Sequence, residues 1–379
     1  MMFNKLKTYF QKDKILAPVC INKKWGFINK NGDMVIPLQF DYAFGFYEGL
    51  AKVIIGQKCG FINSVGEFVV PPIYNDEDRS FNYFICGYAE VRLNGKTLMV
   101  DVKGKTLDVS GYEKTLAFSE GLAAVKLNGK WGYINPRGEM VVSPKYDTTY
   151  EFLEGLAVVE LDHKWGYLDK MGNEVIALKY SDSAEFSEGL ARVEQNNLCG
   201  FIDKEGKEVI ACKYEDASIF SEGMVAVAEN ELWGFINVKG EQVTPFKYNA
   251  QESIWYYRPN IPHIFSEGLA AVQYKGMYGF IDRKGNEVIP FEHAATYGFH
   301  NGLAIVKSKY GYGIIDKKGN EIELLKYEGV KGFFHGLAGV SVSGKWGFIN
   351  GNGEEVIPLQ YDRVGIFTAC NEPFPRIKD

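Results

Sequence analysis

Short runs of alternating apolar and polar residues follow one another along the whole chain, separated by turn residues. In the middle of the chain, a run at 122–127 precedes an Asn-Gly pair, and further runs follow at 130–134 and 139–142. A period of two favours β-strands, and an Asn-Gly pair between apolar runs is typical of a hairpin turn. The pattern therefore predicts a three-stranded antiparallel meander, with a fourth short strand over 146–152.

This pattern recurs ten times along the sequence. Its plainest marker is an aromatic residue followed by glycine, as in Trp131 and Gly132. The marker glycine, or the residue in its place, stands at ten positions: Gly26, Gly60, Leu98, Gly132, Gly166, Gly200, Gly234, Gly279, Gly313 and Gly347. Seven of the nine spacings are 34 residues, and the other two contain insertions of four and eleven residues. A fixed period of this kind indicates a tandem-repeat protein.

Further columns keep the same register. Asn or Asp always stands three residues after the marker and Gly six residues after it, as in Asn135 and Gly138. The Asn side chain can accept backbone N–H bonds at the start of a type I turn, and Gly can adopt the left-handed conformation at its end. Phe recurs in another column, represented by Phe152, and one 34-residue meander is too small to bury such rings. We therefore expect the rings to pack between neighbouring repeats.

The unit that runs from Glu120-Gly121-Leu122 through Trp131-Gly132 to Tyr146-Asp147 resembles the bacterial WG-repeat family. The resemblance covers residues 15 to about 367, and it implies a β-repeat fold that serves as a binding or structural module without catalytic residues. Four positions depart from the motif because another residue replaces its Trp: Cys59, Cys199, Tyr278 and Tyr312. A fifth copy, at Thr97 and Leu98, loses the motif.

The ends of the repeat region bear on its architecture. We expect an N-terminal extension over 1–14, a single repeat domain over 15–367 and a C-terminal tail over 368–379. The first unit lacks its opening segment, which instead closes the chain at 361–367, so the joined ends would complete one unit, as in propellers. Propellers usually have about four to eight blades. We therefore predict an all-β, open, curved or superhelical array of ten antiparallel meanders, with a closed propeller-like ring as the alternative.

Charge and composition exclude several classes of partner. The chain has 48 acidic and 42 basic residues without a basic block, so nucleic acid is not an expected partner. It has no apolar stretch of about 18 residues, which excludes a helical membrane span. No signal peptide is visible, so we expect a cytoplasmic protein, or a secreted one if a signal was removed. The cysteines and histidines lack the spacing of metal ligands, and we expect no metal and no cofactor.

Three columns invite a chemical interpretation, and a structural one is favoured for each. In the first column, Glu precedes Gly. We expect each of these carboxylates to accept a backbone hydrogen bond at a turn or to face solvent, rather than to bind a cation or a basic ligand. The Asn/Asp column offers one side chain per turn, too few oxygens for calcium. The Trp column suits packing between units better than a ladder for sugars, because Cys and Tyr replace the Trp.

The strongest binding signal lies in the insertions, near 75–80 and at 249–263. The second contains Trp255, Tyr256, Tyr257 and Arg258, residue types that are enriched at binding hot spots. The alternative is a loop that folds back to cover an edge of the array. We predict a non-enzymatic module that binds or scaffolds a protein or peptide, with a glycan-binding, lectin-like array as the alternative.

Overall fold

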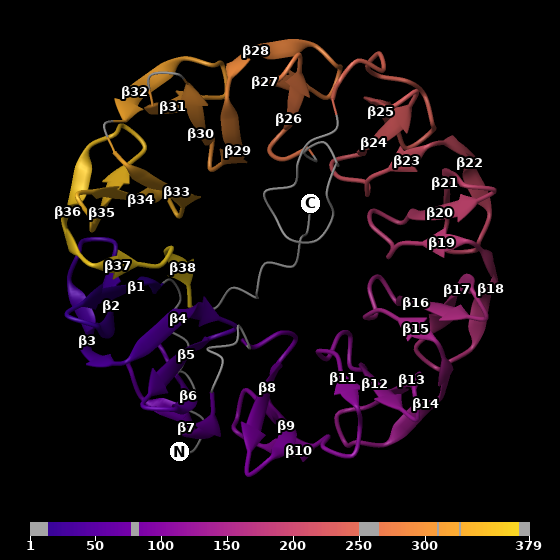
Figure 1. Ribbon diagram of the computed structural model, residues 1–379, viewed down its shortest axis with the longest axis horizontal. Helices are drawn as coiled ribbons and strands as arrows, with labels where there is room; N and C mark the ends of the chain where they lie inside the picture. The colour runs from indigo at the N-terminus through magenta and orange to yellow at the C-terminus, as the bar shows by residue number, and fades with distance from the viewer. Residues whose placement is uncertain (1–13, 77–82, 250–264, 309–310, 326, 371–379) are drawn as a thin grey trace, which may run out of the picture. The chain divides into compact units, whose positions relative to one another are not determined.

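A computed structural model describes residues 14–76, 83–249, 265–308, 311–325 and 327–370 (Figure 1). Every helix or strand that it assigns within these ranges is a β-strand, which confirms the prediction of an all-β fold. The chain divides into two compact units. The first combines Met1–Ser110 with Tyr327–Arg376, and the second is formed by Gly111–Lys326. In Figure 1 the first unit holds the indigo N-terminal and the yellow C-terminal strands.

The first unit holds three sheets, with strand orders β3-β2-β1-β37 (β38 also pairs with β1), β10-β9-β8-β7-β6-β5-β4, and β33-β34-β35-β36. Its strands are β1 (Ile15–Ile21), β2 (Lys24–Asn29), β3 (Met34–Phe40), β4 (Tyr42–Tyr47), β5 (Leu50–Ile55), β6 (Lys58–Ile62), β7 (Phe68–Asn75), β8 (Tyr88–Leu93), β9 (Lys96–Asp101), β10 (Thr106–Asp108), β33 (Gly329–Phe334), β34 (Leu337–Val342), β35 (Lys345–Asn350), β36 (Glu355–Tyr361), β37 (Arg363–Val364) and β38 (Thr368–Ala369).

The second unit holds six sheets, each of which follows the order of the chain. Its strands are β11 (Lys114–Thr115), β12 (Ala123–Leu127), β13 (Lys130–Ile134), β14 (Met140–Tyr146), β15 (Thr148–Thr149), β16 (Leu156–Leu161), β17 (Lys164–Asp169), β18 (Glu174–Tyr180), β19 (Asp182–Ser183), β20 (Ala191–Gln195), β21 (Leu198–Ile202), β22 (Glu208–Tyr214), β23 (Asp216–Ala217), β24 (Met224–Glu229), β25 (Leu232–Asn237), β26 (Leu269–Tyr274), β27 (Met277–Asp282), β28 (Glu287–His293), β29 (Ala295–His300), β30 (Leu303–Ser308), β31 (Gly311–Asp316) and β32 (Glu321–Leu325). Chain order within each sheet confirms the antiparallel meander.

The marker glycine is required by a close approach of two strands. In the pairing of β13 with β14, the register shifts between Trp131 and Tyr133, which marks a bulge at Gly132. A Cβ atom on Gly132 would overlap the carbonyl oxygen of Val142 and lie 2.8 Å from the backbone nitrogen of Pro144. The motif therefore keeps glycine because the return strand leaves no room for a side chain.

The second conserved column forms the predicted turn. The side-chain Oδ1 of Asn135 accepts hydrogen bonds from the backbone N–H groups of Arg137 and Glu139, at 2.9 and 3.1 Å. Gly138, with φ of 79°, closes the turn by donating its N–H to the carbonyl of Asn135. All ten glycines of this column have a positive φ: Gly32, Gly66, Gly104, Gly138, Gly172, Gly206, Gly240, Gly285, Gly319 and Gly353.

Aromatic rings join one repeat to the next, as the sequence predicts. The ring that follows the marker glycine packs on the Phe of the next repeat, with ring centroids 4.8 to 5.1 Å apart. The pairs are Phe27–Phe46, Phe61–Phe84, Tyr133–Phe152, Tyr167–Phe186, Phe201–Phe220, Phe235–Phe265, Phe280–Phe299 and Phe348–Phe367. These contacts bury in the array the rings that a single meander would expose.

The first repeat is completed by the end of the chain. Strand β1 pairs with β2 on one side and with β37 and β38 on the other, and these segments lie side by side in Figure 1. Gly32 faces the side chain of Ile357, just as Gly206 faces Ile176 of the repeat before it. Within the first unit, the last repeat and the first therefore share a sheet, a feature of the propeller-like alternative. The paired strand Thr368–Ala369 falls in the segment that we expected to be a tail.

Candidate functional site

The candidate binding residues Trp255, Tyr256, Tyr257 and Arg258 lie outside the described residues. The structure does place the two ends of their segment. Asn249 pairs with Gln273, and the carbonyl of Phe265 accepts a hydrogen bond from the hydroxyl of Ser221 at 2.7 Å. Ser187 makes the same bond to Phe220 in a repeat without an insertion. The repeat frame thus resumes at Phe265.

Both insertions interrupt the same segment of the repeat. Five residues separate Tyr146 from Phe152 in a standard repeat. Nine separate the equivalent Tyr74 and Phe84, and sixteen separate Tyr248 and Phe265. In standard repeats this segment contains the short first strand of the next sheet, such as β15. The extra residues therefore leave from one defined place in the repeat.

The Glu-Gly pair forms a two-residue hairpin turn. Glu120 and Gly121 have φ values of 50° and 89°, and the flanking Ser119 and Leu122 pair as an antiparallel bridge. Positive φ at both central residues is the type I′ turn that suits the twist of a hairpin. A non-glycine residue in this conformation is strained, and the Glu side chain makes a further contact from it.

The contact is with the next repeat, where each carboxylate accepts backbone N–H groups of the equivalent turn. We call this arrangement the carboxylate clamp. The pairs are Glu48 with Cys86 and Gly87, Glu120 with Gly155, Glu154 with Gly189, Glu188 with Gly223, Glu222 with Gly268, and Glu267 with Asn301 and Gly302. The predicted role as a backbone acceptor is confirmed, but the sequence did not reveal that the donors belong to the neighbouring repeat.

A cation completes four of the six clamps. It follows the Asn or Asp of the turn in the next repeat and contacts the carboxylate at 2.7 to 3.0 Å. The pairs are Lys170–Glu120, Lys204–Glu154, Arg283–Glu222 and Lys317–Glu267. Partial burial raises the pKa of Glu267, but hydrogen bonds from Lys317, Gly302 and Asn301 outweigh it and hold that pKa below its usual value.

We expect Glu267→Gln to destabilise the second unit by about 1.5–3 kcal/mol at pH 7, the value of a hydrogen bond to a charged group. Because folding lowers the pKa of this carboxyl from 4.5, its contribution is complete above pH 4.5 and is lost as pH falls through the lower folded-state pKa. Denaturant unfolding at pH 7 and at pH 3 measures this. Exposed Glu205→Gln is the control. A difference that persists undiminished at pH 3 would contradict the clamp.

The Trp column is part of the packing between strands. Trp25 and Trp233 are buried, which confirms the packing interpretation for both. The other three are half-buried against neighbours. The Tyr150 ring stacks on Trp165 at 5.9 Å, and the ammonium groups of Lys126 and Lys331 lie over Trp131 and Trp346 at 5.8 and 5.3 Å.

Where Cys replaces the Trp, a cation enters the core. Lys52 and Arg192 stand seven residues before Cys59 and Cys199, at a position that is Ala124 in a Trp-containing repeat. Both are buried: Lys52 pairs with Asp76 at 3.0 Å, and Arg192 contacts the Cys199 sulfur at 3.2 Å. Burial raises the pKa of Cys59 to about 11 despite the lowering effect of Lys52. These thiols are therefore protonated packing groups at neutral pH.

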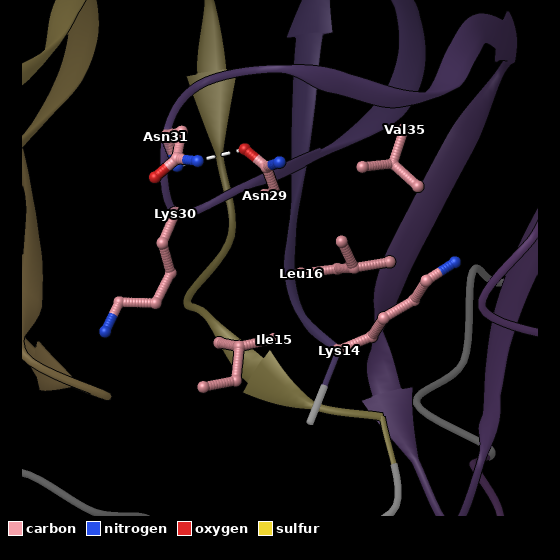
Figure 2. Close-up of a pocket in the computed structure, with 7 residues that line it drawn as sticks. All are labelled: Lys14, Ile15, Leu16, Asn29, Lys30, Asn31 and Val35. Atoms are coloured by element: carbon pink, nitrogen blue, oxygen red, sulfur yellow. Dashed lines mark hydrogen bonds between the residues drawn. The ribbon is translucent and has the colours of Figure 1, made fainter. Parts of the chain in front are cut away.

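A cavity of about 310 Å³ lies in the first unit beside the start of β1. Its lining consists of Lys14, Ile15, Leu16, Asn29, Lys30, Asn31 and Val35 (Figure 2). Figure 2 shows Ile15 between the side chains of the two lysines, and the backbone N–H of Asn31 donating to Asn29. Among the described residues, the lining therefore carries two lysines and no carboxylate. Within the described ranges, no group of three or more His, Cys, Asp or Glu is arranged to hold a metal ion.

The chain matches the family described as WG containing repeat in ten segments, residues 25–59, 60–96, 111–131, 131–165, 165–199, 200–233, 233–250, 278–310, 312–346 and 346–371. These segments span most of the sequence, so the chain belongs to this family. No curated protein matches it in sequence. Among the residues that the structure places, none forms a helix suited to crossing a membrane.

Solved structures resemble the chain in fold. One, titled as the crystal structure of the eukaryotic initiation factor, is 11% identical, has a TM-score of 0.52, and aligns over 96% of this chain and 100% of that chain. Another, BamB from Moraxella catarrhalis, is 11% identical with a TM-score of 0.34, over 78% of this chain and 94% of that chain. At such identities the first likeness concerns the fold alone, and the second is too low to support an argument.

Proposed function

We propose that this protein is a non-enzymatic binding module that holds a protein or peptide. The observation that carries the proposal is the eleven-residue insertion between Tyr248 and Phe265, in an array where seven of the nine spacings are 34 residues. The repeated Glu, Asn and Trp columns are engaged in clamps, turns and packing, so they have structural reasons to recur. The insertion lies outside the 34-residue period, and Trp, Tyr and Arg are the residue types that most often anchor an interface.

The engagement of the Trp rings favours a protein or peptide over a glycan. A sugar platform needs the face of an exposed ring, whereas Trp25 and Trp233 are buried and Trp165 is stacked on Tyr150. A glycan-binding array would also require several similar sites. The insertion occurs once, which suits a single site for one partner.

We expect Trp255→Ala combined with Tyr257→Ala to weaken partner binding by about 2 kcal/mol or more, as for central hot-spot residues. The partner is first captured from cells of the source organism with the full chain as bait and then titrated against both proteins. The control is Tyr150→Ala, which removes an exposed aromatic ring from the equivalent segment of a standard repeat. Unchanged affinity together with a large fall in melting temperature would make the insertion a structural cap.

A further inference from the structure

The carboxylate clamp is incomplete where the last repeat meets the first. Lys30 follows Asn29 in the first repeat, the position from which Lys170 contacts Glu120 in the second unit. The turn that faces Lys30 belongs to the tenth repeat. The ammonium nitrogen of Lys30 lies 3.9 Å from the place that a Cβ atom would occupy on Gly336 of that turn. Lys30 is therefore the clamp cation of this junction.

The acid of this clamp is replaced. His335 occupies the Glu position and keeps the same turn conformation, with φ of 52° against 50° for Glu120. Lys30 is exposed and forms no ion pair with any residue in the described part of the chain. The junction thus keeps the cation of the clamp but has lost its carboxylate.

The cavity of Figure 2 adjoins this junction, because Lys30 and Ile15 line it. Ile15 pairs with Ala369, and the backbone N–H of Cys370 donates to the carbonyl of Lys14 at 2.8 Å. The ladder therefore continues where a Glu-Gly turn closes the other repeats. The ammonium of Lys14 lies 3.5 Å from the carbonyl oxygen of Ser64, so its described contact is also not a carboxylate.

We propose that this cavity binds the carboxylate of an acidic peptide. Lys30 pairs with the carboxylate as Lys170 pairs with Glu120, and Ile15 and Val35 contact the apolar part of the peptide. Charge complementarity supports this ligand, because the described lining holds two lysines and no carboxylate in a protein of net charge −6. The site uses none of the residues 249–263. A negative result for peptide binding at this cavity is therefore separate from a negative result for partner binding at the insertion.

The test titrates the full chain with three pentapeptides by isothermal calorimetry or NMR. The first is acetylated and amidated and has the sequence of residues 118–122, Phe-Ser-Glu-Gly-Leu. The second has Gln in place of Glu. The third also has Gln but ends in a free carboxylate, so the two acidic probes distinguish a side-chain carboxylate from a peptide terminus. At least one acidic probe is expected to bind about fivefold or more tightly than the neutral one, the upper range of an exposed ion pair.

Two variants locate the site. Lys30→Met should weaken the favoured probe by about fivefold or more. His335→Glu supplies a carboxylate that can pair with Lys30, so it should abolish probe binding and raise the melting temperature of the free protein. The control is His163→Glu, which makes the same change of charge at an exposed turn in the second unit and should leave binding unchanged. Equal behaviour of all three probes, including no binding of any, or full affinity in Lys30→Met, overturns the proposal.

Discussion

Gly132→Ala is expected to destabilise the fourth repeat by about 3 kcal/mol, the upper range for forcing an atom into a packed site. The new methyl group would overlap the carbonyl oxygen of Val142 and press on the backbone of Ser143 and Pro144. Backbone atoms cannot rotate away as a flexible side chain can, so β13 and β14 would have to separate. Denaturant unfolding measures the loss, and hydrogen exchange should locate it at 123–146.

Gly155→Ala is the matched control for this substitution. A Cβ atom on Gly155 would meet nothing within 4 Å, but the residue has φ of 88°, which an alanine adopts at a cost of about 1 kcal/mol. The comparison separates the steric requirement at Gly132 from the conformational requirement at a turn. If the two variants lose the same stability, close approach of the strands is not the reason for the marker glycine.

Lys52→Met is expected to cost about 3–5 kcal/mol, because it leaves the carboxylate of Asp76 buried without its ion-pair partner. The two charged groups lie 3.0 Å apart, and both side chains are only 2% exposed. A buried carboxylate that loses an ion-pair partner regains no water in its place, so the loss is costly. The free energy of unfolding, measured with denaturant at neutral pH, reports the loss.

The double variant Lys52→Met with Asp76→Leu should recover most of that stability, because buried ion pairs can be replaced by apolar residues of similar volume. Lys24→Met provides the exposed comparison. Lys24 and Asp41 lie 2.6 Å apart but are 50% and 39% exposed, so its loss should cost less than about 1 kcal/mol. A double variant as unstable as Lys52→Met alone would show that packing of the Lys52 stem, rather than its charge, stabilises the repeat.

The sequence predicts those parts of the fold, turns and strands, whose signals lie within a few consecutive residues. Asn135 and Gly138 lie within one turn, and the strand over Lys130–Ile134 is set by alternation along a single run. The carboxylate clamp depends on the distance between a turn and its equivalent in the next repeat. No pattern within one repeat contains that distance, so Glu120 could be interpreted as a turn acceptor but not assigned its donor.

The buried cations carried a signal that the sequence interpretation did not use. Lys52 and Arg192 break an apolar column in the same two repeats where Cys59 and Cys199 replace the Trp. The coincidence indicates that the two positions compensate in volume: where the small Cys replaces the Trp, the long Lys or Arg side chain fills the space of the indole ring. Recognising it required knowing that the two positions face one core. The binding role of Trp255 and its neighbours stays a prediction.

The order of synthesis gives the shared first repeat a special place in folding. Strands β1 to β3 are synthesised long before their partners, because Leu16 accepts a hydrogen bond from the hydroxyl of Thr368, 352 residues later. Until then the apolar side chains of Ala17, Val19 and Ile28 lack the partners that bury them in the finished protein. Internal repeats can fold as they emerge, whereas this one must wait until the strands over 363–369 have been synthesised. Nascent chains cut short before Tyr361 would therefore present an uncovered sheet, which is the form that chaperones and proteases recognise.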